Sequence, residues 1–205
     1  LKMCHILLVM EFIYEIPNVL PKETCEELIE RFLKDDKKHP STVSGGKADH
    51  EVRKSTNLWI GPNEEGWSDT AKDMFKIFVD GLDKYGHHLV NNNYITFAEG
   101  SRLFGKELRF ESPFINQSLE GDYYHWHADD FTKQVDKQRR SFSCLIYLST
   151  LEEDQGGCTE FMIGNKKVRP EQGKMLIFPS TWTYVHRAGE VKNGGVKYTL
   201  GTWVG

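Results

Sequence analysis

A short segment of the chain carries two residues that could bind a metal ion together. Residues 121–130 read GDYYHWHADD, and His127 and Asp129 are two positions apart. On a β-strand, residues i and i+2 point to the same face, so this imidazole and this carboxylate can aim at a single point. His125 shares that face, so a His-x-His-x-Asp set is also open. The pattern predicts a metal site with its first ligands on one strand.

A further ligand has to come from elsewhere in the chain. Two histidines and one carboxylate with open coordination positions are typical of non-haem Fe(II) oxygenases, in which a cosubstrate and O2 must both reach the metal. His186, in TYVHRAGEV, is the one histidine after residue 127. An antiparallel β-sandwich can bring such distant strands together. His127, Asp129 and His186 are therefore the predicted iron ligands.

Lys197 adds a second kind of chemistry, eleven residues after His186. A lysine that is buried on a strand is costly unless its charge meets an anion. The dicarboxylate 2-oxoglutarate would supply one, with its keto-acid end on the iron and its far carboxylate on the lysine. The alternative is a lysine that faces solvent, and the neighbours Val196, Tyr198 and Leu200 do not decide between the two.

Length and composition suit one compact domain. The chain has 205 residues, 39% of them hydrophobic, and a net charge of −4, so no nucleic-acid partner is expected. The apolar run from Ile6 to Met10 is too short to span a membrane and is better explained as a first β-strand. Four cysteines without zinc-site or disulfide spacing favour free thiols and a cytoplasmic location.

The N-terminal part is expected to be mainly helical. Apolar residues recur at helical spacing within 20–38 and 68–90. Residues 12–16 and 52–60 have strand character, and the segment 38–50 reads as an exposed loop because Gly, Ser and Pro replace apolar residues.

Beyond Asn91, short apolar runs alternate with Gly, Asn and Asp turns. This pattern of short apolar runs and turns predicts an α+β fold that is mainly β, with a sandwich or small barrel as its core. The expected strands lie near 94–97, 108–118, 122–127, 139–148, 158–162, 166–169, 174–178, 183–187 and 196–203.

Five motifs in order resemble the prolyl-4-hydroxylase-like branch of the Fe(II)/2-oxoglutarate dioxygenases. They are GDYYHWHAD (121–129), RSFSCLIYLS (140–149), EEDQGGCTEF (152–161), GKMLIFPS (173–180) and HRAGEVKNGGVKYTLGTW (186–203). The resemblance implies a double-stranded β-helix, or jelly-roll, core with flanking N-terminal helices in a single domain, 1–205. Residues 1–90 would be helical support and 91–205 the jelly-roll core.

The same resemblance implies roles for individual residues. It places the iron on His127, Asp129 and His186, as the spacing does. It implies that Trp203 is the aromatic residue near the cosubstrate, and that Tyr124 lies in the cosubstrate site.

Lys197 matches the family's 2-oxoglutarate anchor, and Thr159 matches the hydroxyl residue that assists it. The family often has a tyrosine nine residues before the first metal-binding histidine, and here that position is Ser118. The resemblance leaves open whether Tyr123, Tyr124 or a water takes its place.

The loop 43–56 resembles a loop that closes over peptide in this branch, and an ordinary surface loop is the alternative. Arg53 and Ser55 match its Arg-x-Ser pattern and, with Arg140, are the expected substrate contacts.

The function that the resemblance implies is hydroxylation of a C–H bond with Fe(II), 2-oxoglutarate and O2, and with ascorbate as an aid. The expected substrate is a prolyl residue in a peptide or protein, and the co-products are succinate and CO2. A free amino acid or other small molecule is the alternative substrate, and a non-catalytic cupin-like binding module is the alternative function. The expected assembly is a monomer or homodimer.

Overall fold

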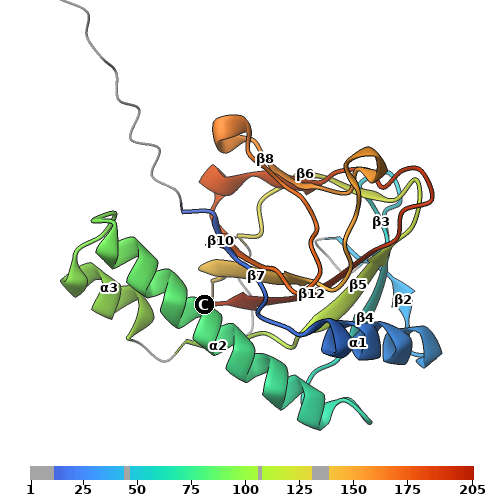
Figure 1. Cartoon of the computed structure of the whole chain (residues 1–205), viewed down its shortest axis with the longest axis horizontal. Coiled ribbons are helices and arrows are strands. Elements are labelled where there is room, and N and C mark those ends of the chain that lie inside the picture. Colours follow the sequence, from blue (N-terminus) through green and yellow to red (C-terminus); the bar gives the residue numbers. More distant parts are fainter. Residues whose placement is uncertain (1–11, 44–46, 106–107, 131–138) are drawn as a thin grey trace, which may run out of the picture.

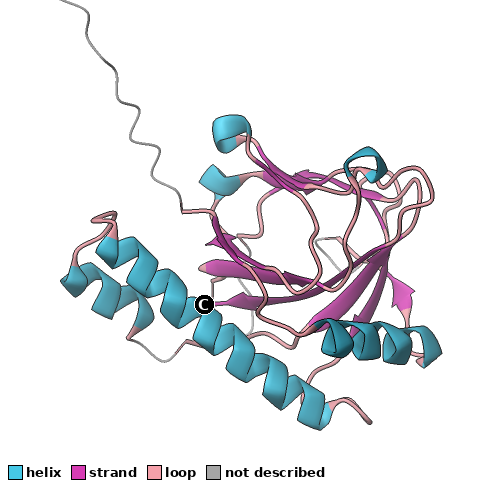
Figure 2. Ribbon diagram, viewed as in Figure 1, coloured by secondary structure: helices cyan, strands magenta, loops and turns pink. Residues whose placement is uncertain are grey.

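Two antiparallel β-sheets that face each other form the centre of the molecule, and helices cover the outer side of the larger sheet (Figures 1 and 2). The computed structural model describes residues 12–43, 47–105, 108–130 and 139–205. In spatial order, the larger sheet contains β1 (Tyr14–Ile16), β10 (Met175–Pro179), β7 (Phe142–Tyr147), β12 (Lys197–Val204), β5 (Phe114–Ser118), β4 (Thr56–Trp59) and β2 (His39–Pro40). The smaller sheet contains β3 (Arg53–Lys54), β6 (Tyr123–His127), β11 (His186–Ala188), β8 (Thr159–Phe161) and β9 (Lys167–Val168).

The central strands of the larger sheet are covered on both faces. β7 (FSCLIY) and β10 (MLIFP) are almost wholly buried, so they read as continuous apolar runs rather than alternating ones. Two apolar clusters result. One packs the larger sheet against the helices, and the other fills part of the space between the sheets with side chains such as Tyr147, Phe161 and Phe178.

The helices α1 (Lys22–Lys34) and α2 (Ser68–Asn91) each bury one stripe against the larger sheet. In α2 the buried large side chains recur every three or four residues, as an amphipathic helix requires. They are Met74, Phe78, Leu82, Tyr85 and Leu89. Gly81 allows the close approach, since a Cβ atom there would lie 2.3 Å from Sδ of Met175 on β10.

The predicted strand at 94–97 is wrong, because a third helix, α3 (Phe97–Phe104), begins there. Thr96 caps it: its hydroxyl accepts from the Glu99 backbone N–H at 3.2 Å, while the Glu99 carboxylate accepts from the Thr96 N–H at 2.8 Å. This reciprocal capping box is readable as Thr-x-x-Glu, so the signal was present in the sequence.

Other boundaries also differ from expectation. The strand expected at 52–60 divides into β3 and β4, which lie in different sheets. The strand expected at 108–118 is reduced to β5. The run at 183–187 divides into a short 3-10 helix, η3 (Trp182–Tyr184), and β11; the remaining 3-10 helices are η1 (Glu153–Gln155) and η2 (Ile163–Asn165).

Strands from both sides of residue 91 build the two sheets. The N-terminal strands β1, β3 and β4 pair with β10, β6 and β5 respectively, and β2 pairs with β4. The expected division into a helical support (1–90) and a jelly-roll core (91–205) therefore does not separate the elements of the core.

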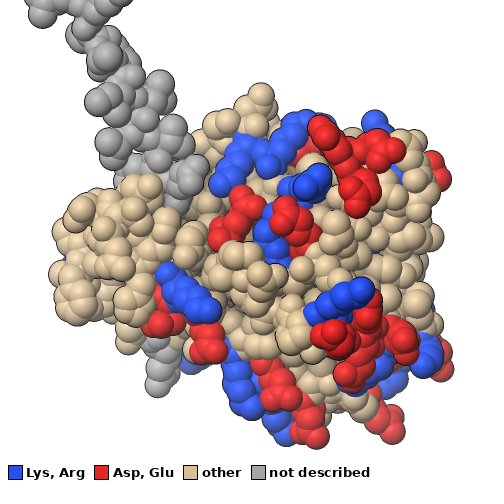
Figure 3. All heavy atoms as spheres, in the orientation of Figure 1, with Lys and Arg blue, Asp and Glu red and all other residues tan. Residues whose placement is uncertain are grey.

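The structure bears on several of the compositional expectations. Cys25, Cys144 and Cys158 are free, and Cys4 and the strand expected at Ile6–Met10 lie outside the described residues. None of the helices in the described ranges is long and apolar enough to cross a membrane. On the face drawn in Figure 3, basic and acidic side chains lie beside one another rather than in separate patches.

Removing the cap of α3 is expected to destabilise the protein. Thr96→Ala deletes the hydroxyl that satisfies the Glu99 N–H, which should lower the free energy of unfolding by about 1 kcal/mol. Urea denaturation measures the change. Ser101→Ala is the matched control, because this exposed residue lies inside α3 and caps nothing; an equal loss in both variants would contradict a capping role.

Candidate metal centre and ligand cavity

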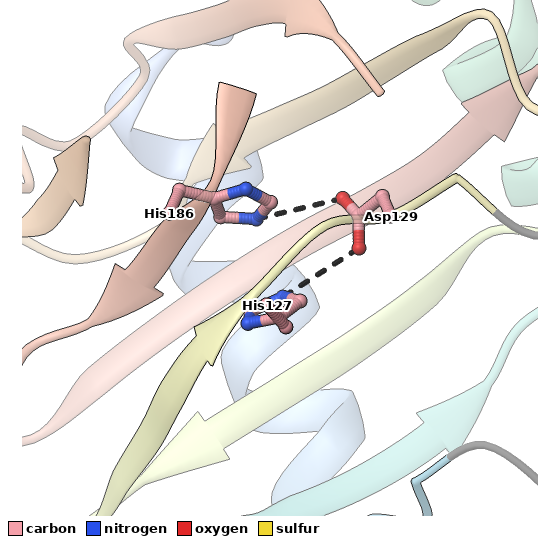
Figure 4. A group of neighbouring side chains, drawn as sticks. All are labelled: His127, Asp129 and His186. Atoms are coloured by element: carbon pink, nitrogen blue, oxygen red, sulfur yellow. Dashed lines mark ion pairs between the residues drawn. The ribbon is translucent and has the colours of Figure 1, made fainter. Parts of the chain in front are cut away.

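The three predicted metal ligands meet at the ends of two neighbouring strands of the smaller sheet. His127 ends β6, Asp129 follows it by two residues, and His186 begins β11. The antiparallel register places His186 directly opposite His127. One ligand atom from each residue lies within 4.8 Å of the others (Figure 4). The structure thus brings together residues that are 59 positions apart in sequence.

Each imidazole is oriented by a local hydrogen bond. Nδ1 of His127 donates to the carbonyl oxygen of His125 at 2.7 Å, and Nδ1 of His186 donates to that of Tyr184 at 3.0 Å. A carbonyl oxygen only accepts, so the proton sits on Nδ1 and the Nε2 lone pair is available. Both Nε2 atoms face the Asp129 carboxylate, at 3.6 Å from His127 and 3.5 Å from His186. This donor set and its orientation fit a divalent metal.

The electrostatics of His186 and Asp129 favour the protonation states that a metal needs. Burial lowers the pKa of His186 to about 4, so this imidazole is neutral near pH 7. Burial alone would raise the pKa of the Asp129 carboxyl, but the positive charge that His186 carries once it is protonated in acid holds this pKa well below its usual range. The hydroxyl of Ser143 contributes by donating to Asp129 Oδ2 at 2.7 Å. A neutral histidine and an ionised carboxylate are the forms that ligate metals.

The three metal-binding candidates line a cavity between the two sheets. Its volume is about 730 Å³, which includes the solvent-filled opening. Most of the other predicted site residues line it too: Lys197, Thr159, Trp203, Tyr124, Arg53 and Ser55. Alternation on β12 explains two of them. Lys197, Thr199, Gly201 and Trp203 line the cavity, whereas Tyr198, Leu200 and Val204 belong to the apolar cluster on the helical side. Lys197 is therefore not a solvent-facing strand residue.

Lys197 is buried, with 5% of its surface exposed. Its Nζ donates to the carbonyl oxygen of Gly157 at 2.6 Å, and no carboxylate pairs with it among the described residues. Burial lowers its pKa to about 8. Beside it, the Tyr147 hydroxyl donates to Oγ1 of Thr159 at 2.7 Å. A buried cation beside two hydroxyl groups can receive a carboxylate.

Tyr124 and Arg53 form a stacked column next to the metal-binding candidates. The Tyr124 ring lies on the His127 ring with 3.6 Å between centroids and 18° between planes. The Arg53 guanidinium also lies over the Tyr124 ring, with Cζ 4.7 Å from the ring centroid. Its Nε donates to Ser55 Oγ at 3.3 Å. Burial lowers the pKa of Arg53, although a guanidinium stays charged.

The position of Ser118 is directly opposite Lys197, and both side chains line the cavity. Tyr123 directs its hydroxyl to the carbonyl oxygen of His50, at 3.0 Å. Tyr124 lies against His127 instead of Ser118. Asn116, which sequence reasoning missed, receives the Ser118 hydroxyl at 3.4 Å and adds polar surface to this wall.

Arg140 is the third of the expected substrate contacts. It is not among the residues that line the cavity. Its guanidinium binds Glu111 through two hydrogen bonds and lies over the ring of Trp203. Its side chain therefore contacts the cavity residue Trp203, and a substrate contact by Arg140 stays a prediction. Of loop 43–56, residues 44–46 lie outside the described part, and residues 53–54 pair with β6.

Ser143 was also missed by sequence reasoning, because a serine inside an apolar strand gives no metal-binding signal. Only the register between β7 and the neighbouring strands brings its hydroxyl to Asp129.

Arg187 lines the cavity as well, and Glu160 pairs with it at 2.9 Å.

The model of the 2OG-Fe(II) oxygenase superfamily matches residues 114–205. Residues 114–205 are therefore similar in sequence to the domain of this superfamily. This segment contains all three metal-binding candidates, Lys197 and Trp203. The family uses the cofactors predicted from the triad, iron(II) and 2-oxoglutarate with O2, and the donor set fits that metal.

A PKHD-type hydroxylase of Prochlorococcus marinus is 31% identical over 92 residues, covering 44% of this chain and 39% of that protein. The match spans about two fifths of the length of such curated relatives.

Similarity to solved structures extends over nearly the whole chain. A viral collagen prolyl hydroxylase from Paramecium bursaria Chlorella virus-1 has a TM-score of 0.64 at 20% identity, covering 95% of this chain and 96% of that one. A prolyl hydroxylase from Trichoplax adhaerens has a TM-score of 0.67 at 17% identity, covering 94% and 82%. These similarities confirm the predicted fold class, a mainly β jelly-roll with flanking helices.

The Ser143 hydroxyl is expected to matter for metal binding. Ser143→Ala removes the hydrogen bond that orients Asp129, which should weaken Mn(II) or Co(II) binding by roughly tenfold or more. Calorimetric titration measures this affinity. Ser149→Ala is the control, because Ser149 follows the same strand but bonds the Val196 carbonyl instead. Unchanged metal affinity in Ser143→Ala would refute the orienting role.

Proposed function

We propose that this chain is a hydroxylase that binds Fe(II) through His127, Asp129 and His186 and uses 2-oxoglutarate and O2. One observation carries the proposal: the three convergent donors share a cavity with Lys197, a buried cation without a carboxylate partner in the described ranges. When bound, iron and 2-oxoglutarate would supply the oxidant for a C–H bond, leaving succinate and CO2.

The chain's own residues would bind and orient these groups. Lys197 would receive the far carboxylate of 2-oxoglutarate, assisted by the hydroxyl of Thr159. Trp203 and Tyr124 would close the cavity on either side and limit the access of water to it. The Nδ1 hydrogen bonds of both histidines would keep Nε2 aimed at the metal.

A prolyl residue in a peptide or protein is the substrate we propose. The solved prolyl hydroxylases with the same fold support this choice, and the Trichoplax adhaerens structure contains a peptide fragment of a hypoxia-inducible factor. Arg53 and Ser55, which line the cavity, would contact such a peptide.

A free amino acid or another small acid is the second candidate substrate. The observation that favours it is Arg53, which lies over Tyr124 in the cavity and whose charge interacts with the Asp129 carboxylate without forming a direct ion pair among the described residues. A substrate carboxylate would satisfy that charge. Incubation with Fe(II), 2-oxoglutarate and either proline-containing peptides or free amino acids, followed by mass spectrometry, separates the two candidates by which one gains an oxygen atom.

The proposed iron site can be tested by anaerobic titration with Fe(II) and 2-oxoglutarate. We expect the visible absorption band of the 2-oxoglutarate–Fe(II) chelate in the wild type and no band in His127→Ala, which removes a donor. His125→Ala is the matched control, because the exposed His125 ring packs against Tyr123 and is not one of the three convergent donors. Loss of the band in His125→Ala as well as in His127→Ala would favour the His-x-His-x-Asp set.

The same titration separates an enzyme from a binding module. A folded wild-type protein that binds iron but shows neither the band nor succinate formation would support a non-catalytic, cupin-like module and sink the proposed function.

The proposed anchor predicts a pH dependence of 2-oxoglutarate binding. Lys197 has a pKa of about 8 and attracts a carboxylate only when protonated. The affinity for 2-oxoglutarate should therefore be highest below pH 8 and fall as the pH rises above 8. The fall should be about tenfold per pH unit, up to the higher pKa that Lys197 has when the ligand is bound. Calorimetry with Mn(II) and 2-oxoglutarate measures the slope.

Lys197→Arg provides the control for this titration, because a guanidinium stays charged throughout that range. Its affinity, even if weaker, should not change across pH 8. An equal slope in both proteins would show that another group titrates and that Lys197 is not the anchor.

A further inference from the structure

The indole of Trp203 forms part of the cavity wall and contacts two other side chains. The ring of Phe114 lies against it, with 4.9 Å between ring centroids and 30° between planes. The Arg140 guanidinium lies over it, with Cζ 3.6 Å from the indole centroid. Stacking at this distance combines cation–π attraction with close planar contact. The orientation of the wall thus depends on what holds Arg140.

Glu111 holds Arg140 in place. Nε of Arg140 donates to Oε1 of Glu111 at 2.7 Å, and Nη2 donates to Oε2 at 2.9 Å. Only 17% of the Arg140 side chain and 11% of the Glu111 side chain are exposed. This two-point geometry fixes the plane of the guanidinium, which a single contact to a point charge would not do.

Glu111 is itself tied to the strand that carries Trp203. Its backbone N–H donates to the carbonyl oxygen of Trp203 at 2.8 Å. The Thr202 hydroxyl donates to the carbonyl oxygen of Glu111 at 2.7 Å. Glu111, Arg140 and Trp203 are therefore connected to one another at the end of β12, and of these three residues Trp203 lines the cavity.

We propose that Arg140 and Glu111 are positioning residues that fix the Trp203 indole as a wall of the ligand cavity. Arg140 acts through Trp203, and Glu111 acts through Arg140. The consequence for 2-oxoglutarate binding rests on the proposed function, whereas the effect on the indole does not. The proposal is an alternative to the expectation that Arg140 contacts the substrate.

Fluorine NMR of the full chain labelled with 5-fluorotryptophan tests the proposal without any ligand. The chain has five tryptophans, and Trp203→Phe assigns the resonance of residue 203. We expect Arg140→Gln and Arg140→Lys to shift or broaden this resonance, because lysine keeps the charge but lacks the planar face. Glu111→Gln should move it in the same direction by less.

A double variant adds a test of the order of action. Glu111→Gln combined with Arg140→Gln should move the resonance no further than Arg140→Gln alone, since the Glu111 carboxylate acts on the indole through Arg140 and both variants keep the backbone hydrogen bonds of Glu111. Additive shifts would mean that Glu111 supports Trp203 independently of Arg140, which would overturn the proposed order.

Arg31→Gln is the matched control, because Arg31 lies 4.0 Å over the ring of Trp67, away from the cavity. It should move the Trp67 resonance and leave that of Trp203 unchanged. A second readout is Mn(II)-dependent 2-oxoglutarate binding, expected to weaken roughly threefold in Arg140→Gln but not in Arg31→Gln.

An unchanged Trp203 resonance in folded Arg140→Gln and Glu111→Gln would overturn the proposal. So would a loss of peptide binding in Arg140→Gln with no change at Trp203, which would make Arg140 a substrate contact. If all five resonances move in Arg140→Gln, the fold is lost and Glu111→Gln decides. A wild type that binds no 2-oxoglutarate would refute the proposed function, while the resonance of Trp203 would still decide this inference.

Discussion

The register between β6 and β11 is the constraint on which the site depends. It sets His186 opposite His127 and so brings two distant imidazoles to one carboxylate. A slip of one residue would turn one of the rings to the opposite face of the sheet. Once the register is set, orientation is local: each histidine bonds the carbonyl oxygen two residues before it. β11 also pairs with β8, which carries Thr159 to the same cavity.

Positive charge gathers in this cavity although the chain is acidic overall. Arg53, Arg187 and Lys197 line the cavity, together with one acidic residue, Asp129. The Lys197 ammonium donates to a neutral carbonyl oxygen and not to a carboxylate. Most of the free-energy cost of removing this charge from water is therefore not offset. An anionic ligand would offset that cost, so the burial of the cation and the binding of a dicarboxylate are two aspects of one arrangement.

β12 shows how one strand serves both the core and the site. Its alternate residues face the helices or the cavity, so Lys197 and Trp203, six positions apart, lie on one wall. The apolar face of the strand anchors it rigidly in the core. Rigid anchoring matters because ligands must be held within a fraction of an ångström for productive geometry. The contacts behind Trp203 extend this support beyond the strand itself.

The sequence by itself determined the fold class and the residue types of the site. Strict i, i+2 spacing placed His127 and Asp129 on one face, and the order of motifs indicated His186 and Lys197. The tertiary structure decided what depends on contacts between distant segments: the approach of Ser143 to Asp129 and the contact of Arg140 with Trp203. Spacing along one strand is a local property that residue identities reveal. Which side chain from another strand fills the space beside it depends on register and packing, which no single segment encodes.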